Sequence, residues 1–197
     1  MKIYYLALSL LSLFRTTQSS QCVCTTVPCP VEGWNNLTIH SAEDKPDNTM
    51  AWYKYELHNS IPVVVKANVT AHVDTIGAGS GTTSCTRSYA QGMDDDGIVD
   101  CDAGHIFAHH LGGPGNQPLN IFPQNGPMNK GTYNQFETKI YNCLMETNGP
   151  YFLSWNFYYN DTTRTKPDFV DYTYEYNGND KVSDDCQYAT EYFDNRN

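Results

Sequence analysis

Seven cysteines, all placed after an apolar leader, limit the folds open to this chain more than any other feature. A basic residue, an apolar run over residues 3–14 and small polar residues up to Ser20 have the pattern of a secretory signal peptide. So short a run cannot span a bilayer, which needs roughly 20 apolar residues. We therefore predict a signal peptide over residues 1–20. Residues 21–197 should form a single secreted, extracellular domain without membrane contact, in which disulfides can form.

The cysteine count is odd, so one thiol stays unpaired if the others form disulfides. We predict one disulfide between Cys85 and Cys101, which bracket a short excursion of the chain. A second is predicted between Cys143 and Cys186, where it would tie the C-terminal tail to a helix. A zinc cluster on the three N-terminal cysteines is the alternative, although no histidine lies near them at zinc-finger spacing.

Three N-glycosylation sequons, which begin at Asn36, Asn68 and Asn160, agree with a eukaryotic secretory route and predict a glycoprotein. The run from Ile61 to Val73 alternates apolar and polar residues, which predicts a strand with Asn68 on its solvent face. The apolar face of this strand would comprise Val63, Val65, Ala67, Val69, Ala71 and Val73.

Two further segments have residues that could bind a ligand. The glycines of Gly77–Gly81 could cradle a phosphate, but no Lys-Ser or Lys-Thr follows them, so a flexible turn is favoured. Asp94–Gly97, with Asp100 and Asp102, offers hard oxygens to calcium, but no glutamate closes a calcium loop. A solvated acidic turn is therefore the favoured interpretation.

Helical spacing of apolar residues predicts a helix from Met128 to Asn148, followed by a Gly-Pro stop. Asn129, Tyr133 and Glu137 follow one another at four-residue steps, so they are predicted to form a second stripe that faces a cleft. Aromatic residues at alternating positions predict paired strands over 151–159 and 169–176. The tyrosines there could stack nucleic-acid bases, but a half-buried hairpin with its hydroxyls at the surface is favoured.

The net charge of −10 and the pI near 4.8 favour turnover of nucleic acid over its tight storage, which needs a broad basic footprint. They are compatible with an enzyme, because cleavage needs only a metal and a few cations at one point. For a nucleic-acid substrate, this balance predicts weak binding and a strong dependence on divalent metal. The sequence indicates no protein partner.

Residues 100–137 combine one histidine, two asparagines and a glutamate at spacings typical of a single-metal site. His105 is largely neutral at physiological pH, since the ordinary histidine pKa is near ~6.5, and it can take a proton from water. Asn120 and Asn129 offer neutral amide oxygens, the kind of ligand that magnesium accepts.

These segments resemble the secreted DNA/RNA non-specific endonuclease family, whose ββα-metal site (the His-Me finger) carries an Asp-Arg-Gly-His signature. Asp102-Ala103-Gly104-His105 is similar to that signature, and Asn120-Ile121-Phe122-Pro123-Gln124 resembles the Asn-Ile-x-Pro-Gln segment. Asn129, Gly131 and Glu137 match the helix pattern, and the likeness covers residues 85–146. The resemblance implies an α+β fold: a mixed antiparallel sheet with a ββα-metal nuclease core, stabilised here by disulfides.

The resemblance also implies roles for individual residues. His105 would be the general base, Asn129 the direct magnesium ligand and Glu137 an outer carboxylate that orients metal-bound water, while Asn120 would position the histidine or the substrate. Manganese or calcium could replace magnesium at such oxygen ligands. The substrates would be DNA and RNA, cleaved with little sequence preference to leave 5′-phosphate ends.

One departure from the signature matters, because Ala103 stands where the family has an arginine. Arg87, in a segment similar to an upstream arginine segment of toxin-like relatives, could supply the missing charge. The alternative is a secreted binding or effector protein that resembles a nuclease but has weak or no activity. A further alternative is an extracellular module stabilised by calcium or zinc, since His105 and His109 have a spacing that zinc sites use.

Overall fold

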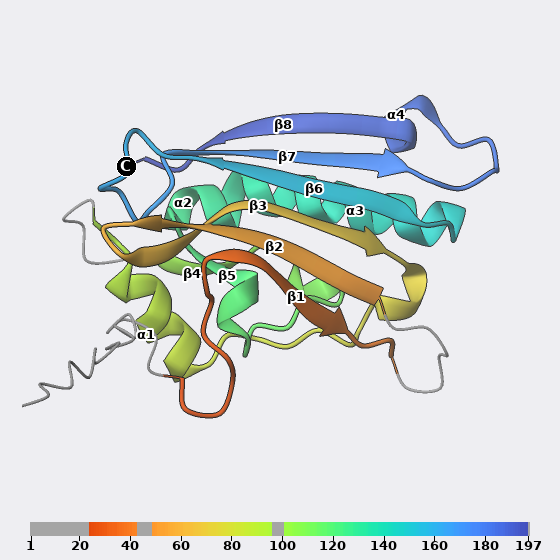
Figure 1. Cartoon of the computed structure of the whole chain (residues 1–197). Helices are drawn as coiled ribbons and strands as arrows, with labels where there is room; N and C mark the ends of the chain where they lie inside the picture. Colours follow the sequence, from red (N-terminus) through yellow and green to blue (C-terminus); the bar gives the residue numbers. More distant parts are fainter. Residues whose placement is uncertain (1–23, 43–48, 96–100, 197) are drawn as a thin grey trace, which may run out of the picture.

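The computed structural model describes residues 24–42, 49–95 and 101–196, and it combines two antiparallel sheets with helices (Figure 1). The strands are β1 (Gly33–Ile39), β2 (Thr49–His58), β3 (Ile61–Ala71), β4 (Asp102–His105), β5 (Ile121–Gln124), β6 (Tyr151–Tyr158), β7 (Phe169–Tyr176) and β8 (Tyr188–Asp194). The helices and helical turns are η1 (Val73–Thr75), α1 (Ser84–Gly92), η2 (His109–Leu111), η3 (Pro118–Asn120), α2 (Gly126–Met128), η4 (Asn129–Tyr133), α3 (Asn134–Thr147) and α4 (Asp184–Gln187).

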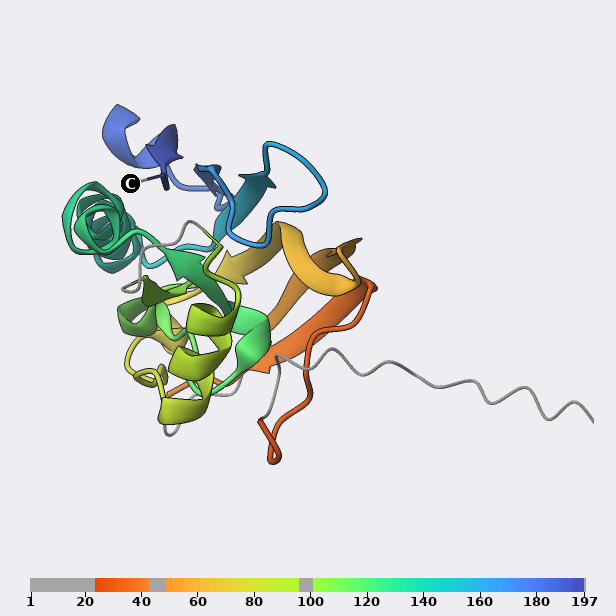
Figure 2. The same ribbon diagram turned by 90° about the vertical axis from the view of Figure 1, so that its left-hand side faces the viewer.

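The larger sheet has six strands in the order β1-β2-β3-β6-β7-β8, and β4 pairs with β5 in a separate ribbon. The ribbon, α1 and α3 lie on one side of the larger sheet, and its other side is open (Figure 2). The core between these layers is rich in aromatic side chains, among them Tyr53, Phe122, Tyr133, Trp155 and Tyr172. The predicted α+β class with a mixed antiparallel sheet is confirmed.

The strand predicted from residue 61 onward is present as β3, but its alternation is interrupted by a β-bulge. Lys54 pairs with Lys66 and the next residue of β2 pairs with Val64, so Val65 is the extra residue. Val64 therefore packs into the core in place of Val65, which is only half-buried. The strand ends at Ala71, two residues earlier than the pattern predicts.

The helix predicted over residues 128–148 is interrupted near its start. Gly131, inside η4, has φ −103° and ψ −110°, which lie outside the helical region, and the regular helix α3 begins only afterwards. Asn129 and Glu137 therefore do not lie on one continuous helix. The predicted stripe that faces a cleft is wrong, because Tyr133 between them is fully buried and accepts a hydrogen bond from Trp155 Nε1 at 3.0 Å.

The predicted hairpin is present, with β6 and β7 antiparallel and in register from Tyr151 opposite Tyr176. The expectation of tyrosine hydroxyls at the surface is wrong for most of these residues. Tyr151, Tyr172 and Tyr174 are fully buried, because their side of the hairpin packs under α3. Buried rings cannot stack nucleic-acid bases.

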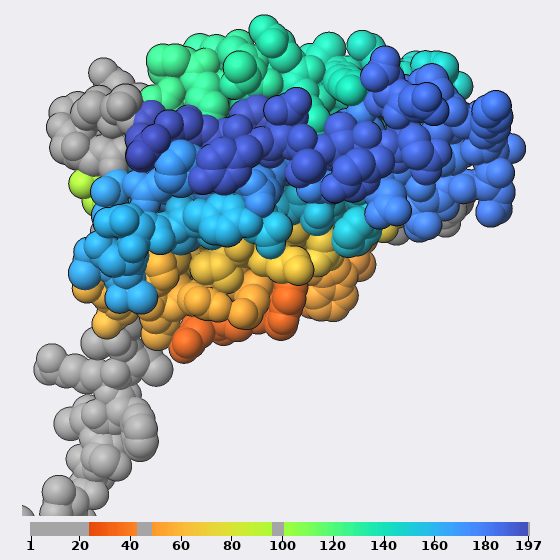
Figure 3. Space-filling view, turned by 90° about the horizontal axis from the view of Figure 1, so that it is seen from above, coloured from red at the N-terminus to blue at the C-terminus, as the bar shows by residue number. Residues whose placement is uncertain are grey.

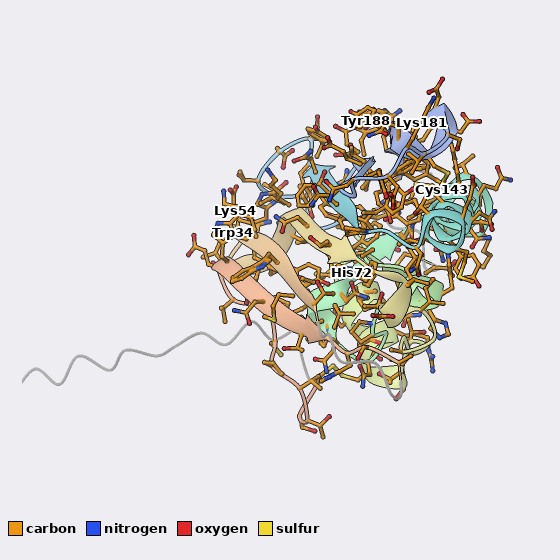
Figure 4. The ribbon with its side chains drawn as sticks, turned by 90° about the vertical axis from the view of Figure 1, so that its right-hand side faces the viewer. Trp34, Lys54, His72, Cys143, Lys181 and Tyr188 are labelled. Carbon is orange, nitrogen blue, oxygen red and sulfur yellow. A yellow bond between two sulfur atoms is a disulfide. The ribbon has the colours of Figure 1, made fainter. Side chains whose placement is uncertain are left out.

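Two disulfides cross-link the described chain, and one differs from the prediction. Cys143 on α3 is bonded to Cys186, as expected (Figure 4). Cys85 is bonded to Cys24 rather than to Cys101, which is a buried free thiol whose Sγ lies 3.6 Å from the Ala90 backbone oxygen. Cys24 cannot be a ligand of the alternative zinc cluster on the N-terminal cysteines, because it forms this disulfide. Cys22 lies outside the described residues.

The described part of the acidic turn makes ion pairs and hydrogen bonds with the loop between β6 and β7, although Asp95 stays partly exposed to solvent. Asp95 lies 3.2 Å from Arg164 Nε and accepts a hydrogen bond from the Thr165 backbone N–H at 2.7 Å. The Asp94 carboxylate lies 3.8 Å from Lys166 Nζ, and both side chains are buried. These aspartates therefore anchor the loop between β6 and β7. Of the other members of the predicted calcium alternative, residues 96, 97 and 100 lie outside the described residues, and Asp102 is paired with Lys130 at 2.8 Å.

The predicted signal peptide also lies outside the described residues. Within the part of the chain that the structure describes, no helix combines the length and apolar character needed to cross a membrane.

Candidate functional site

The ribbon of β4 and β5 carries two of the sequence motifs. Asp102 pairs with Gln124 across the ribbon, and Gly104 lies beneath the Gln124 side chain. A Cβ at Gly104 would lie 1.9 Å from Gln124 Oε1, so only glycine fits there. The glycine of the Asp-x-Gly-His motif is therefore a packing requirement, and the glutamine of the second motif imposes it.

His105 ends β4 with its imidazole half-buried against a turn. Its Nε2 lies 3.0 Å from the backbone oxygen of Ser80. Because a carbonyl oxygen can only accept, Nε2 carries the hydrogen and Nδ1 keeps its lone pair. Burial lowers the pKa of His105, and this effect exceeds the opposing effect of the hydrogen bond to Ser80. His105 is thus held as a neutral imidazole whose Nδ1 can accept a proton.

Two glycine-containing turns meet around His105. The backbone N–H of Ser80 donates to the Gly113 oxygen at 3.2 Å, and the N–H of Gly115 donates to the Ser80 oxygen at 2.9 Å. A Cβ at Gly115 would lie 2.6 Å from His105 Nε2, so the absence of a side chain permits this approach. The segment 77–81, predicted to be a flexible turn, is instead fixed against the histidine, and the sequence showed only its glycines.

The two other histidines of the motif segment lie beside His105. The ring of His109 stacks against that of His105, with centroids 6.0 Å apart and an interplanar angle of 18°. The described residues contain no group of three His, Cys, Asp or Glu side chains that could hold a metal, so the zinc pair of His105 and His109 lacks a third ligand there.

Burial lowers the pKa of His110, whose ring packs edge-on against Tyr141. A cavity of about 450 Å³ is lined by Ile76, Gly77, His109, His110, Asn134, Thr138 and Tyr141.

Asn120 is fully buried and supports the chain that follows His105. Its Oδ1 accepts hydrogen bonds from the Phe107 backbone N–H and from the Tyr53 hydroxyl, both at 2.8 Å. Its Nδ2 donates to the Phe107 backbone oxygen at 2.9 Å and to that of Pro114 at 3.4 Å. The structure therefore places Asn120 where it can position the histidine segment, with no exposed surface for a substrate.

Asn129 contacts the strand that carries His105. Its Nδ2 donates to Asp102 Oδ2 at 3.0 Å, and Lys130 Nζ lies 2.8 Å from the same carboxylate oxygen. This contact fixes the amide and leaves Oδ1, on its other arm, as a hard oxygen. Lys130 is a cation that sequence reasoning missed, although its position next to Asn129 was the available signal.

Glu137, predicted to orient metal-bound water, lies on the buried face of α3, where its side chain is 7% exposed. Burial raises its pKa well above the ordinary value. Burial also raises the pKa values of Tyr133 and Tyr172, and the nearby Glu137 carboxyl adds to both shifts. Among the described residues it shares no hydrogen bond with His105 or Asn129.

Arg87 is exposed on α1, and its Nη1 donates to the Thr82 backbone oxygen at 2.9 Å. Thr82 is two residues from Ser80, so Arg87 is tied to the turn that holds His105. Ala103, where the family signature has arginine, packs against a small apolar cluster made of Tyr89, Ala90, Met93, Cys101 and Ile121.

A family model described as DNA/RNA non-specific endonuclease matches residues 53–178, which include the whole motif segment of residues 100–137. The "Probable deoxyribonuclease RhsA" of Dickeya dadantii (strain 3937) is 32% identical over 121 residues, or 61% of this chain. The match spans only 8% of the length of that relative.

Two solved structures share the fold. NucA from Streptococcus agalactiae with no metal bound has a TM-score of 0.53 and 15% identity, covering 87% of this chain and 84% of that chain. NucA from the same organism with magnesium ion bound has a TM-score of 0.51 and 16% identity, covering 88% and 86% of the two chains. At such identities the likeness concerns the fold alone.

Proposed function

Because the chain belongs to the DNA/RNA non-specific endonuclease family, we propose that it is a secreted, magnesium-dependent endonuclease that hydrolyses DNA and RNA phosphodiester bonds. The observation that carries this proposal is the state of His105. Its Nε2–H is committed to the Ser80 carbonyl, so Nδ1 is the free proton acceptor. A lowered pKa keeps that nitrogen unprotonated at physiological pH.

In the proposed reaction, His105 Nδ1 takes a proton from the water that attacks phosphorus. The P–O bond to the 3′ oxygen breaks with its electron pair, and that oxygen takes up a proton from solvent water. The product ends are a 5′-phosphate and a 3′-hydroxyl. Asn120 acts indirectly, because its four hydrogen bonds hold the loop that leaves His105. The stacked ring of His109 limits the movement of the imidazole.

The residues present fit a magnesium ion at Asn129. Magnesium commonly keeps several waters and needs only one or two protein oxygens in a phosphate site. The Asp102 carboxylate holds the Asn129 amide in place, and Oδ1 is a ligand of the right chemistry. When bound, the metal would offset the charge that develops on the phosphate and the leaving oxygen. Manganese or calcium could occupy the same oxygen site.

The negative net charge restricts the substrate contacts to a few local cations. Lys130 lies beside Asn129, and Arg87 is tied to the turn of His105, so both can meet phosphates near the cleavage point. Either residue could supply the positive charge that the family signature has as an arginine at the position of Ala103. Phosphate contacts carry no base information, which supports cleavage with little sequence preference.

Two observations favour a second candidate, a nuclease-like binding or effector protein with weak or no activity. Ala103 removes a cation from the signature, and Glu137 is buried against the core rather than hydrogen-bonded to the other motif residues. This candidate predicts nucleic-acid or protein binding without turnover.

The test is the degradation of plasmid DNA and total RNA by the purified secreted protein, with magnesium, with EDTA, and with the Asn129→Ala variant. We expect cleavage of both substrates with magnesium, none with EDTA, and a lower rate with a higher magnesium requirement for Asn129→Ala. Asn142→Ala, an exposed position on α3, serves as the matched control. Failure of the folded wild type to cleave with any of several divalent metals would favour the second candidate.

A further inference from the structure

The open face of the six-stranded sheet carries large apolar side chains that no element within residues 24–42, 49–95 and 101–196 covers. The exposed fractions are 53% for Trp34 on β1, 38% for Met50 and 42% for Trp52 on β2, and 40% for Phe152 on β6, which β3 separates from β2. These strands and β3 lie side by side on one surface of the molecule (Figure 3). Contiguous exposed apolar surface of this kind usually has something that covers it.

Two of the three sequon asparagines stand in the same cross-strand row as Trp52. Asn36 of β1 is opposite Trp52, and Trp52 is opposite Asn68 of β3. Directly opposite residues point to the same side of a sheet, and neighbouring strands are about 4.8 Å apart. Trp52 is therefore flanked on both sides by a sequon asparagine within about 5 Å, measured between strands.

Alternate residues of a strand lie on the same face of the sheet, so the threonine of each sequon lies on the face that carries its asparagine. Thr38 and Thr70, two residues after the asparagines, also lie on the open face, where Thr38 is opposite Met50 and Thr70 is opposite Phe152. Asn36 is exposed and Asn68 is half-buried, so the side chain of each reaches the surface. Both sequons thus present asparagine and threonine outward, on either side of the exposed apolar residues of β2.

We infer that Asn36 and Asn68 carry N-linked glycans whose first N-acetylglucosamine units cover Trp52 and its apolar neighbours on the open face. The inference requires the secretory route that the leader predicts, and it is independent of nuclease activity. Asparagine Nδ2 attacks C1 of a lipid-pyrophosphate-linked oligosaccharide. The C–N bond forms, the C–O bond to pyrophosphate breaks with its electron pair, and the amide gives up one proton to a base.

The chemistry of the face favours sugar over nucleic acid as its cover. The C–H-rich side of a pyranose ring packs on an indole, and a glycan brings its own polar surface to the solvent. A base-stacking surface would also need cations for the phosphates. The cross-strand row next to that of Trp52 contains two lysines, Lys54 and Lys66. Lys54 lies beside Trp34 in Figure 4, and its Nζ is paired with the Glu56 carboxylate at 2.8 Å. Only Lys66 of that row is exposed without such an ion pair among the described contacts.

The chain contains its own reporter and its own control. It has three tryptophans, of which Trp34 and Trp52 lie on the open face and Trp155 is buried. Fluorescence quenching by acrylamide therefore reports mainly on this face. Asn160 belongs to the third sequon but lies in the exposed loop between β6 and β7, so its loss should leave the open face unchanged.

The experiment uses the full chain secreted from a eukaryotic host that adds high-mannose glycans. Intact mass is compared for the wild type, Asn36→Gln, Asn68→Gln and Asn160→Gln. We expect Asn36→Gln and Asn68→Gln each to lose the mass of one glycan. A wild type that carries no glycan at either position would overturn the inference.

Coverage is measured on the folded wild type after two enzymatic treatments, which avoids variants that fail to fold. An endoglycosidase that leaves the first sugar on asparagine should not change acrylamide quenching, whereas an amidase that removes the whole glycan should increase it. The double variant Asn36→Gln/Asn68→Gln should match the amidase product, and Asn160→Gln should match the wild type. Equal quenching in all samples would contradict coverage, as would single-stranded DNA binding by the glycosylated protein that Trp52→Ala abolishes.

Discussion

His105 illustrates how single residues acquire their chemistry from their surroundings. Its tautomer is set by the Ser80 carbonyl, and burial moves its pKa below the ordinary value of 6.5. A lowered pKa keeps the base neutral further into the acid range. We therefore expect the acid limb of kcat/KM against pH to have a midpoint below 6.5. A midpoint at or above that value would mean that another group, or a charged His105, controls the rate.

Glu137 is the residue whose burial has the clearest consequence for stability. Its pKa is raised in the folded protein above the ordinary 4.5, so the unfolded chain ionises first as pH rises. The stability that the neutral carboxyl permits is complete below pH 4.5 and declines as pH rises towards the folded pKa. Glu137→Gln stays neutral, so its Tm in EDTA should exceed that of the wild type at pH 7 and equal it at pH 4.

The matched control is Glu146→Gln, an exposed position on the same helix, which should leave Tm unchanged at both pH values. A lower Tm for Glu137→Gln at pH 7 would show that the glutamate is ionised and stabilised by a cation.

At the scale of elements, the loop between β6 and β7 depends on a buried ion pair. Lys166 is 1% exposed and lies 3.8 Å from Asp94. Removing one partner of a buried pair commonly costs about 3–5 kcal/mol, because it leaves the other charge in the interior. We expect Lys166→Met to lower the free energy of unfolding by that order, as measured in urea. Lys66→Met, at an exposed lysine of β3, should have little effect.

The double variant Asp94→Asn/Lys166→Met should recover much of the loss, because it removes both charges. Equal destabilisation by Lys166→Met and Lys66→Met would show that the pair contributes nothing.

The elements also show what hydrophobic periodicity can and cannot predict. Strand β3 and the hairpin of β6 and β7 were predicted, since their alternating patterns are long. The bulge at Val65 was not, because it is set by pairing with β2. The interruption at Gly131 was likewise not predicted, since a glycine within a helical pattern does not by itself indicate non-helical dihedral angles. That interruption separated Asn129 from Glu137 and overturned the predicted stripe.

At the scale of the whole molecule, the disulfide map determines which thiol is free. Cys24 is bonded to Cys85 and Cys143 to Cys186, while Cys101 is buried with its pKa raised by burial to about 12. We expect iodoacetamide at pH 8 to leave Cys101 unlabelled in the folded protein and to label it once the protein is unfolded without reductant, which keeps the disulfides intact. Peptide mass spectrometry would locate the label. Labelling of Cys85 under those conditions would support the Cys85–Cys101 pairing instead.

The whole-molecule prediction succeeded for the family and the fold class, and the reason lies in local motifs. Gly104 and Gln124 are adjacent only in space, yet both belong to short segments that the resemblance recognised. The supports of His105 come from distant segments without a motif. Neither the Ser80 carbonyl nor the bond from Tyr53 to Asn120 could be predicted from residue order alone.

We propose that His105 is the general base of the hydrolytic reaction. The direct test compares initial rates of plasmid cleavage in magnesium for the wild type, His105→Ala and His40→Ala, the last at an exposed histidine. General-base catalysis typically contributes about 10²–10⁴-fold, so His105→Ala should lose rate by that order while retaining the wild-type Tm. His40→Ala should cleave normally. Cleavage by folded His105→Ala at the wild-type rate would contradict the account.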